Sequence, residues 1–221
     1  MRILVISPHM DDEVLVMGGT IARHVSEGDD VYICFIAHRV YEHKYDAEKN
    51  QFEVECALKA KQVLGYKEAE FFNLSDERLD ACIQDILIPL EEYVKKVDPE
   101  IVYVCHRGDN NQDHRAVFEA AIVALRSSAN RRIKRMLCYE VPSSTEQSPP
   151  FKEYAFLPNF YVNIEDHLRT KIEALRCYTT ERRPFPHPRS ERSIEALAMK
   201  RGVEASFKAA EAFVVLRERW D

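Results

Sequence analysis

The sequence has no long run of apolar residues and no excess of basic ones. Its opening stretch of apolar or small residues, 3–7, ends at Pro8. A membrane-spanning helix needs about 18 or more such residues, and the apolar part of an export signal is also longer. Lys and Arg number 31 against 37 Asp and Glu, a formal net charge of −6, whereas a nucleic-acid binder needs a basic face. We therefore expect neither a membrane nor a nucleic-acid partner.

Closely spaced cysteines are absent as well. The six cysteines lie at least 22 residues apart, and no two of them form a C-x-x-C pair. This spacing excludes a zinc ribbon and a thiol redox motif. Most of them lie in apolar runs such as 31–37 and 101–105, so we expect buried, reduced thiols in a cytoplasmic protein.

Strand-length apolar runs alternate with longer amphipathic stretches, a pattern typical of βαβ units and a mainly parallel sheet. The sequence predicts an α/β domain over 1–221, with a core at 1–141 and a C-terminal elaboration at 142–221. The Pro- and Ser-rich segment 142–150 is expected to be a loop or lid between them. The expected strands are 2–6, 31–36, 69–74, 101–105, 135–141, 160–164 and the terminal 210–218; the expected helices are 18–25, 47–64, 79–97, one from 114, one capped by Asp166, and 194–201.

The stretch SPHMDDE (7–13) directly follows the first predicted strand. In an open α/β sheet, ligands bind in the loops at the carboxyl ends of strands. One histidine and three carboxylates lie within residues 9–13, and such closely spaced carboxylates repel one another. A bound cation would relieve that repulsion.

A second cluster, HRGDNNQDHRAV (106–117), follows another predicted strand and supplies His106, Asp109, Asp113 and His114. Imidazole and carboxylate ligands without thiolates suit Zn²⁺, or Fe²⁺ or another divalent transition metal, in a site with a free position for water. Either cluster alone could be an ordinary loop histidine or an acidic helix N-terminus. Two clusters at strand ends favour a metal site.

These residues carry a family resemblance. SPHMDDEVLVMGGTIA (7–22) resembles the AHPDDExxxGGTIA motif of the PIG-L/LmbE-like metal-dependent de-N-acetylases, and DHRAV (113–117) resembles their second motif. Further similarity is found at 139–145, 171–178, 186–190 and 210–213. The resemblance implies a Rossmann-like three-layer αβα fold and a zinc-dependent hydrolase that removes an N-acetyl group from an amino sugar or related small conjugate.

The resemblance also assigns roles. His9, Asp12 and His114 would hold the metal, and Asp11 would be the general base toward a metal-bound water. Many members of the family have a histidine as oxyanion donor where this chain has Asn111. The donor could be Asn111, His106 or His187, and the sequence leaves these alternatives open.

Other residues are expected around the substrate. Asp113 is predicted either to support an active-site imidazole or to cap the helix that follows. Arg189, with His187 and Arg39, is expected to contact the substrate. The arginine-rich segment 176–192 could hold a phosphate or carboxylate, and an exposed loop that only adds solubility is the alternative for Arg182 and Arg183. The resemblance implies that the partner is a small N-acetylated molecule, with or without a phosphate or nucleotide, and an oligomer is compatible with the sequence.

Two other functions fit parts of the sequence. One is a metal or sugar binder of the same fold without turnover. The other is a receiver-like signalling domain, in which an acidic pair binds Mg²⁺. That domain needs an acceptor aspartate at the end of the third strand, where this chain has Asn73. A receiver-like domain is also only about half as long as this chain.

Overall fold

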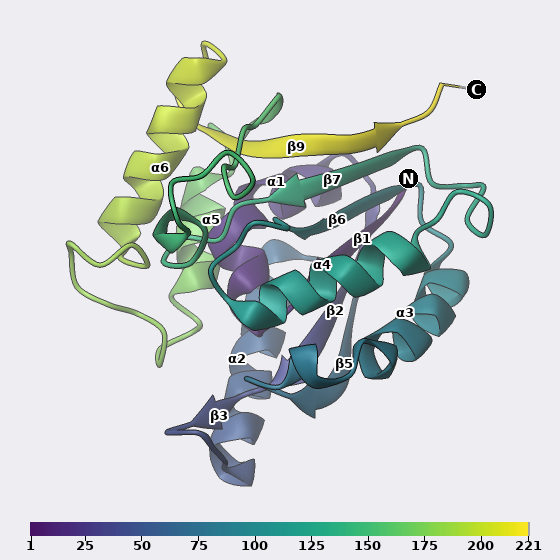
Figure 1. Cartoon of the computed structure of the whole chain (residues 1–221). Helices are drawn as coiled ribbons and strands as arrows, with labels where there is room; N and C mark the ends of the chain where they lie inside the picture. Colours follow the sequence, from purple (N-terminus) through teal and green to yellow (C-terminus); the bar gives the residue numbers. More distant parts are fainter. Residues whose placement is uncertain (221) are drawn as a thin grey trace.

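The computed structural model describes residues 1–220. A seven-stranded sheet in the order β5-β2-β1-β6-β7-β9-β8 forms its centre, and a two-stranded β3-β4 hairpin lies apart from it (Figure 1). The strands are β1 (Arg2–Ser7), β2 (Asp30–His38), β3 (Val40–Tyr41), β4 (Lys44–Tyr45), β5 (Glu68–Ser75), β6 (Ile101–Cys105), β7 (Arg135–Tyr139), β8 (Phe160–Asn163) and β9 (Ala210–Glu218).

Helices cover both faces of the sheet (Figure 1). Helices α3 and α4 pack together on one face, whereas α1, α2 and α5 pack on the other, and α6 lies against β9 and α5. The helices are α1 (Asp12–Ser26), α2 (Ala47–Leu64), α3 (Ile83–Val97), α4 (Gln112–Ala124), α5 (Leu168–Leu175) and α6 (Glu191–Glu204), with 3₁₀ turns η1 (Leu79–Ala81) and η2 (Thr145–Gln147). This is the predicted α/β architecture of three layers.

The five strands from β1 to β7 in the main sheet are parallel. In chain order they are arranged 3-2-1-4-5, the Rossmann order, whereas receiver domains have the order 2-1-3-4-5. The receiver-like alternative is therefore wrong. The order reverses between β1 and β6, which pair directly, and ligands bind beside such a reversal point.

The core strands are apolar on both faces because helices cover them from both sides. All five residues of β6 are buried, and so are all residues of β1 after Arg2. The part of the chain after residue 141 adds β8 and β9 to the same sheet, with β9 antiparallel to both β7 and β8. Among residues 1–220, no helix combines the length and apolar character needed to cross a membrane.

Local signals set several boundaries as the sequence predicts. Helix α2 spans 47–64, with the Asp46 carboxylate accepting hydrogen bonds from the amides of Glu48 and Lys49, both at 3.1 Å. Gly65 ends this helix in the left-handed conformation, with φ of 77°, which glycine adopts without steric cost. Strands β6 and β9 also have their predicted bounds.

Other predicted boundaries are wrong. Helix α1 begins at Asp12 rather than at Gly18, so the acidic cluster lies in its first turn. Helix α5 begins at Leu168, with His167 rather than Asp166 at the cap position. Strand β7 ends at Tyr139, before Glu140 and Val141.

Candidate metal centre

The loop between β1 and α1 holds the first cluster in a constrained conformation. Asp11 is the N-cap of α1, with φ of 113° and ψ of −31°, a region that non-glycine residues rarely adopt. The Asp12 carboxylate accepts a hydrogen bond from the His9 amide at 3.1 Å, and the Glu13 carboxylate accepts one from the Asp11 amide at 3.2 Å. Such strain persists only where surrounding contacts enforce it, and it is concentrated at functional sites.

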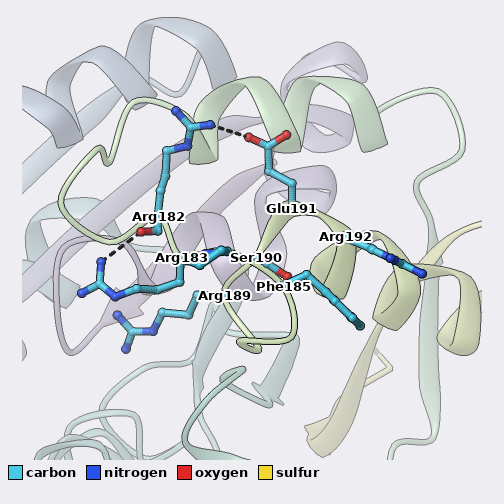
Figure 2. Close-up of a pocket in the computed structure, with 8 residues that line it drawn as sticks. Arg182, Arg183, Phe185, Arg189, Ser190, Glu191 and Arg192 are labelled. Atoms are coloured by element: carbon cyan, nitrogen blue, oxygen red, sulfur yellow. Dashed lines mark hydrogen bonds and ion pairs between the residues drawn. The ribbon is translucent and has the colours of Figure 1, made fainter.

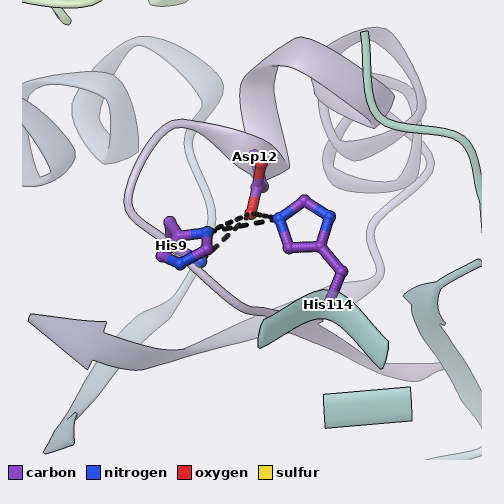
Figure 3. Close-up of side chains that lie close together, drawn as sticks. All are labelled: His9, Asp12 and His114. Atoms are coloured by element: carbon purple, nitrogen blue, oxygen red, sulfur yellow. Dashed lines mark hydrogen bonds and ion pairs between the residues drawn. The ribbon is translucent and has the colours of Figure 1, made fainter. Parts of the chain in front are cut away.

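The second cluster approaches from the loop between β6 and α4. Because β1 and β6 are neighbours, His114 in the first turn of α4 reaches the β1 loop. Figure 3 shows His9, Asp12 and His114 converging. His9 Nδ1 lies 3.2 Å from His114 Nε2, and Asp12 Oδ2 lies 3.4 Å from each of these nitrogens. All three residues are buried.

This triangle of atoms fits a divalent metal. Zinc binds histidine nitrogen and carboxylate oxygen at about 2.0–2.2 Å, so two of its ligands in a tetrahedral arrangement lie about 3.3–3.5 Å apart. The separations of 3.2 Å and 3.4 Å agree with that spacing. Two imidazoles and one carboxylate leave a fourth position for water or substrate.

Neighbouring carboxylates surround both histidines. His114 Nδ1 lies 3.2 Å from Asp109 Oδ1, and Asp109 in turn accepts hydrogen bonds from the Ser144 and Thr145 hydroxyls. His9 Nε2 lies 3.0 Å from Asp76 Oδ1 and 3.3 Å from Asp113 Oδ2. Carboxylates at this position orient metal-binding imidazoles and make them more basic.

The electrostatics of the cluster favour added positive charge. Burial lowers the pKa of His114. The charge of Asp12 and the contact with Asp109 outweigh this effect and raise the pKa to about 9. Burial also opposes the charged form of His9, yet its contacts with Asp113, Asp12 and Asp76 hold its pKa well above the usual value. A site that draws protons onto buried imidazoles also attracts a divalent cation.

Asp11 differs from Asp12 in both contacts and charge. Burial raises the pKa of Asp11 to about 7, against the lowering effect of the Arg189 charge. Burial also opposes ionisation of Asp12, but His114 and His9 hold its pKa well below the usual value. Among residues 1–220, Asp11 Oδ1 has no hydrogen-bond partner. Asp11 thus has a free oxygen and a proton affinity suited to exchange near neutral pH.

Arginines line the other side of Asp11. Arg189 Nη1 donates to Asp11 Oδ2 at 2.9 Å and to Glu181 Oε2 at 2.5 Å, and its Nε donates to Ser143 Oγ at 2.8 Å. Arg39 Nη2 donates to the other oxygen of Glu181 at 2.6 Å. Two expected substrate residues, Arg189 and Arg39, therefore lie in one ion-pair network that reaches the predicted base.

The remaining predicted residues lie elsewhere. The Asn111 side chain caps α4 by accepting a hydrogen bond from the Asp113 amide at 2.8 Å, so the alternative that Asp113 caps this helix is wrong. Asp113 instead contacts His9 and accepts hydrogen bonds from the amides of Glu77 and Leu79.

His106 Nε2 lies 3.1 Å from the Tyr154 carbonyl oxygen, and His187 Nδ1 accepts a hydrogen bond from the Arg189 amide at 3.1 Å. In the described part of the chain, neither histidine has a polar contact with the metal-site side chains or with Asp11. The same holds for the Asn111 side chain.

Sequence reasoning missed two residues of the site, Asp76 and Glu181. Asp76 follows β5 at the same sheet edge, and its position after a strand was the available signal. Glu181 had no such signal, because its ion pair with Arg39 joins two segments far apart in the sequence. Glu13 is one of the three carboxylates of the first cluster. Burial raises the pKa of Glu13 to about 8, and the Tyr178 hydroxyl donates to its carboxylate at 2.6 Å.

The chain is similar to known proteins in sequence and in fold. A relative from Escherichia coli (strain K12), an uncharacterized deacetylase, YaiS, is 29% identical over 180 residues, which cover 79% of this chain and 88% of the relative. The N,N'-diacetylchitobiose deacetylase from Pyrococcus horikoshii has a similar structure, with a TM-score of 0.76, 21% identity and coverage of 97% and 83% of the two chains.

The fold also occurs in an enzyme of a different reaction class. The structure of GalB, the 4-carboxy-2-hydroxymuconate hydratase from Pseudomonas putida KT2440, is similar with a TM-score of 0.78 and 22% identity, covering 100% of this chain and 98% of that one. The family model for GlcNAc-PI de-N-acetylase, PIG-L, matches residues 4–125, which contain both His/Asp clusters. The chain therefore belongs to the PIG-L family of deacetylases.

Proposed function

We propose that the chain hydrolyses an N-acyl group, most often acetyl, on a small polar amine such as an amino sugar. His9, Asp12 and His114 would hold one divalent metal ion, zinc or iron. The observation that carries the proposal is that His9 Nδ1, Asp12 Oδ2 and His114 Nε2 lie at the separations expected of metal ligands. Beside them, Asp11 has one oxygen without a hydrogen-bond partner among residues 1–220. When bound, the metal supplies Lewis acidity that polarises the acyl carbonyl and makes water more acidic.

The residues of the chain supply the proton transfers. Asp11 accepts a proton as water adds to the acyl carbonyl and returns it to the nitrogen as the C–N bond breaks, leaving acetate and the free amine. Its Oδ1 has no hydrogen-bond partner among residues 1–220 and is available to take the proton. Arg189, which donates to Asp11 at 2.9 Å, orients the base, and Arg189, Arg39 and His187 would contact the rest of the substrate.

The test combines metal content with acetate release. Elemental analysis of the purified protein and its His114→Ala variant should give about one zinc or iron per chain in the wild type and little in the variant. The metal-loaded wild type should release acetate from at least one member of a panel of N-acetylated sugars. Stoichiometric metal without release from any would favour the metal or sugar binder, and no metal uptake would contradict the site itself.

A further inference from the structure

Two helices of the protein begin at an aspartate, and the two aspartates have different conformations. Asp46, the N-cap of α2, has extended backbone with φ of −131°, and its carboxylate accepts hydrogen bonds from two amides of the first turn. Asp11, the N-cap of α1, has φ of 113°, and within the described chain its carboxylate makes no such hydrogen bond. Capping is the usual role of an aspartate at this position, so other contacts hold Asp11 out of it.

Hydrogen bonds fix the backbone of Asp11 on both sides of its Cα atom. Its carbonyl oxygen accepts from the amides of Val14 and Leu15 at 3.1 and 3.0 Å, as in an ordinary first helical turn. Its amide donates to the Glu13 carboxylate at 3.2 Å. Because φ is the rotation between the amide and the carbonyl group, these two anchors together determine it. The rare φ of Asp11 therefore depends on Glu13.

Glu13 is itself held by a tyrosine from the C-terminal part of the chain. The Tyr178 hydroxyl donates at 2.6 Å to Glu13 Oε1, whereas Oε2 is the atom that accepts from the Asp11 amide. Both side chains are fully buried, and 165 residues separate them in the sequence. A buried polar group with all of its partners in place is rigid, so Tyr178 fixes the orientation of the Glu13 carboxylate.

The backbone conformation of Asp11 determines what its side chain can contact. Asp11 Oδ2 accepts from Arg189 Nη1 at 2.9 Å, and Oδ1 has no hydrogen-bond partner among residues 1–220. In the conformation of Asp46, the carboxylate would instead accept hydrogen bonds from the amides at the start of α1. The free oxygen beside the metal-site residues would then be lost.

We infer that Glu13 and Tyr178 are positioning residues that hold Asp11 in its rare conformation and so keep its carboxylate available as the general base. The inference rests on the proposed function and adds two residues to it, neither of which touches the reacting atoms. In the described part of the chain, the Glu13 side chain and Tyr178 have no polar contact with His9, Asp12 or His114. Metal binding should therefore not depend on them.

Substrate binding should also be independent of this contact. Arg189 lines a pocket of about 450 Å³ in the segment 182–192 (Figure 2). Its guanidinium group is held by Glu181 at 2.5 Å and by Ser143 at 2.8 Å as well as by Asp11. It therefore keeps two partners if Asp11 moves. Loss of the positioning contact is expected to lower kcat and to leave KM near its wild-type value.

Kinetics of the metal-loaded full chain test this effect. Tyr178→Phe removes one hydrogen bond to Glu13 and changes no charge. We expect its kcat for acetate release to fall about tenfold, which is part of the roughly 10²- to 10⁴-fold that a general base contributes. Glu13→Ala removes both hydrogen bonds and should lose more. Glu13→Gln keeps one oxygen as an acceptor, so its kcat should lie between those of Glu13→Ala and the wild type.

Tyr66 provides the matched control. It is also a buried tyrosine near Glu13, since burial and the Glu13 charge both raise its pKa, but its hydroxyl donates to the Ala57 carbonyl oxygen at 3.4 Å. Tyr66→Phe should therefore keep the wild-type kcat. An equal loss of kcat in the two phenylalanine variants, or a loss of metal or a rise in KM in place of the kcat loss in Tyr178→Phe, would overturn the inference.

Crystal structures of Glu13→Ala and Tyr178→Phe test the positioning without turnover. We expect Asp11 to leave its φ of 113° for extended backbone and to cap α1 as Asp46 caps α2. If the wild type releases no acetate but Asp11 changes in this way, the proposed function fails and the positioning stands. If Asp11 keeps its conformation in Glu13→Ala, the positioning is refuted even where acetate is released. If it does so in Tyr178→Phe alone, the role of Tyr178 is refuted.

Discussion

Helix α1 contacts two buried clusters of charged side chains, which differ in how many of their polar atoms have a hydrogen-bond partner. In the middle of the helix, the Glu211 carboxylate accepts hydrogen bonds from the amides of Gly19 and Thr20 at 3.0 and 2.6 Å and from Lys171 Nζ at 2.6 Å. At the start of the helix, Asp11 has an unpartnered oxygen and a φ of 113°. Buried polar groups are normally satisfied. Thr20 Oγ1 also lacks a hydrogen-bond partner among residues 1–220, but the free Asp11 oxygen lies beside the ligand triangle and therefore indicates chemistry, whereas the three donors to the Glu211 carboxylate indicate structure.

The largest expected effect is at the unsatisfied cluster. Replacing Asp11 by asparagine keeps the size of the side chain and tolerates positive φ but removes the proton acceptor. We expect kcat for acetate release to fall about 10²- to 10⁴-fold, the usual contribution of a general base, with the metal content unchanged. Kinetics and elemental analysis on the same preparation test this.

Asp12→Asn is the matched comparison, because it changes the neighbouring carboxylate in the same way. It should lower metal affinity as well as kcat, since Asp12 Oδ2 belongs to the ligand triangle. A normal kcat in Asp11→Asn, or loss of metal from it, would contradict the division of roles between the two aspartates.

The satisfied cluster should respond in stability instead. Lys171→Met leaves the buried Glu211 carboxylate without its cation, and breaking a buried ion pair costs about 3–5 kcal/mol. We expect the free energy of unfolding, measured by urea denaturation, to fall by that amount, while kcat of the folded protein changes little.

The double variant Lys171→Met/Glu211→Gln should recover part of this loss. The two amides donate to different oxygens of Glu211, so a glutamine keeps an acceptor for one of them, and no buried charge is left unpaired. A double variant less stable than Lys171→Met alone would show that the Glu211 charge stabilises the Gly19 and Thr20 amides independently of Lys171.

A smaller effect is expected where α1 packs most closely. A Cβ atom on Gly19 would lie 2.8 Å from the side chain of Ile164, so Gly19→Ala requires a shift between α1 and the segment after β8. Overpacking of this kind costs about 1–3 kcal/mol. Thermal unfolding of this variant should show the loss.

The sequence predicts the fold better than it predicts the contacts within the site. Strand and helix positions follow from local periodicity and caps, so α2 and β6 have their predicted bounds. The convergence of His9 and His114 depends on β1 and β6 being neighbours, which no local pattern encodes. The same limit explains Asp109 and Asp113: both lie near His114 in sequence, but Asp109 faces His114 whereas Asp113 faces His9.

Asn111 provides the finest test of the distinction between structural and chemical polar groups. Its side-chain oxygen caps α4, so Asn111→Ala should lower the free energy of unfolding by about 1 kcal/mol. If Asn111 instead donates to the oxyanion, kcat would fall by the equivalent of about 2.7–4 kcal/mol. We expect the stability loss with kcat near the wild-type value. Asn111→Asp can still cap α4 but lacks the amide donor, so its stability should remain near wild type, and a large loss of kcat in Asn111→Ala would assign Asn111 to the reaction.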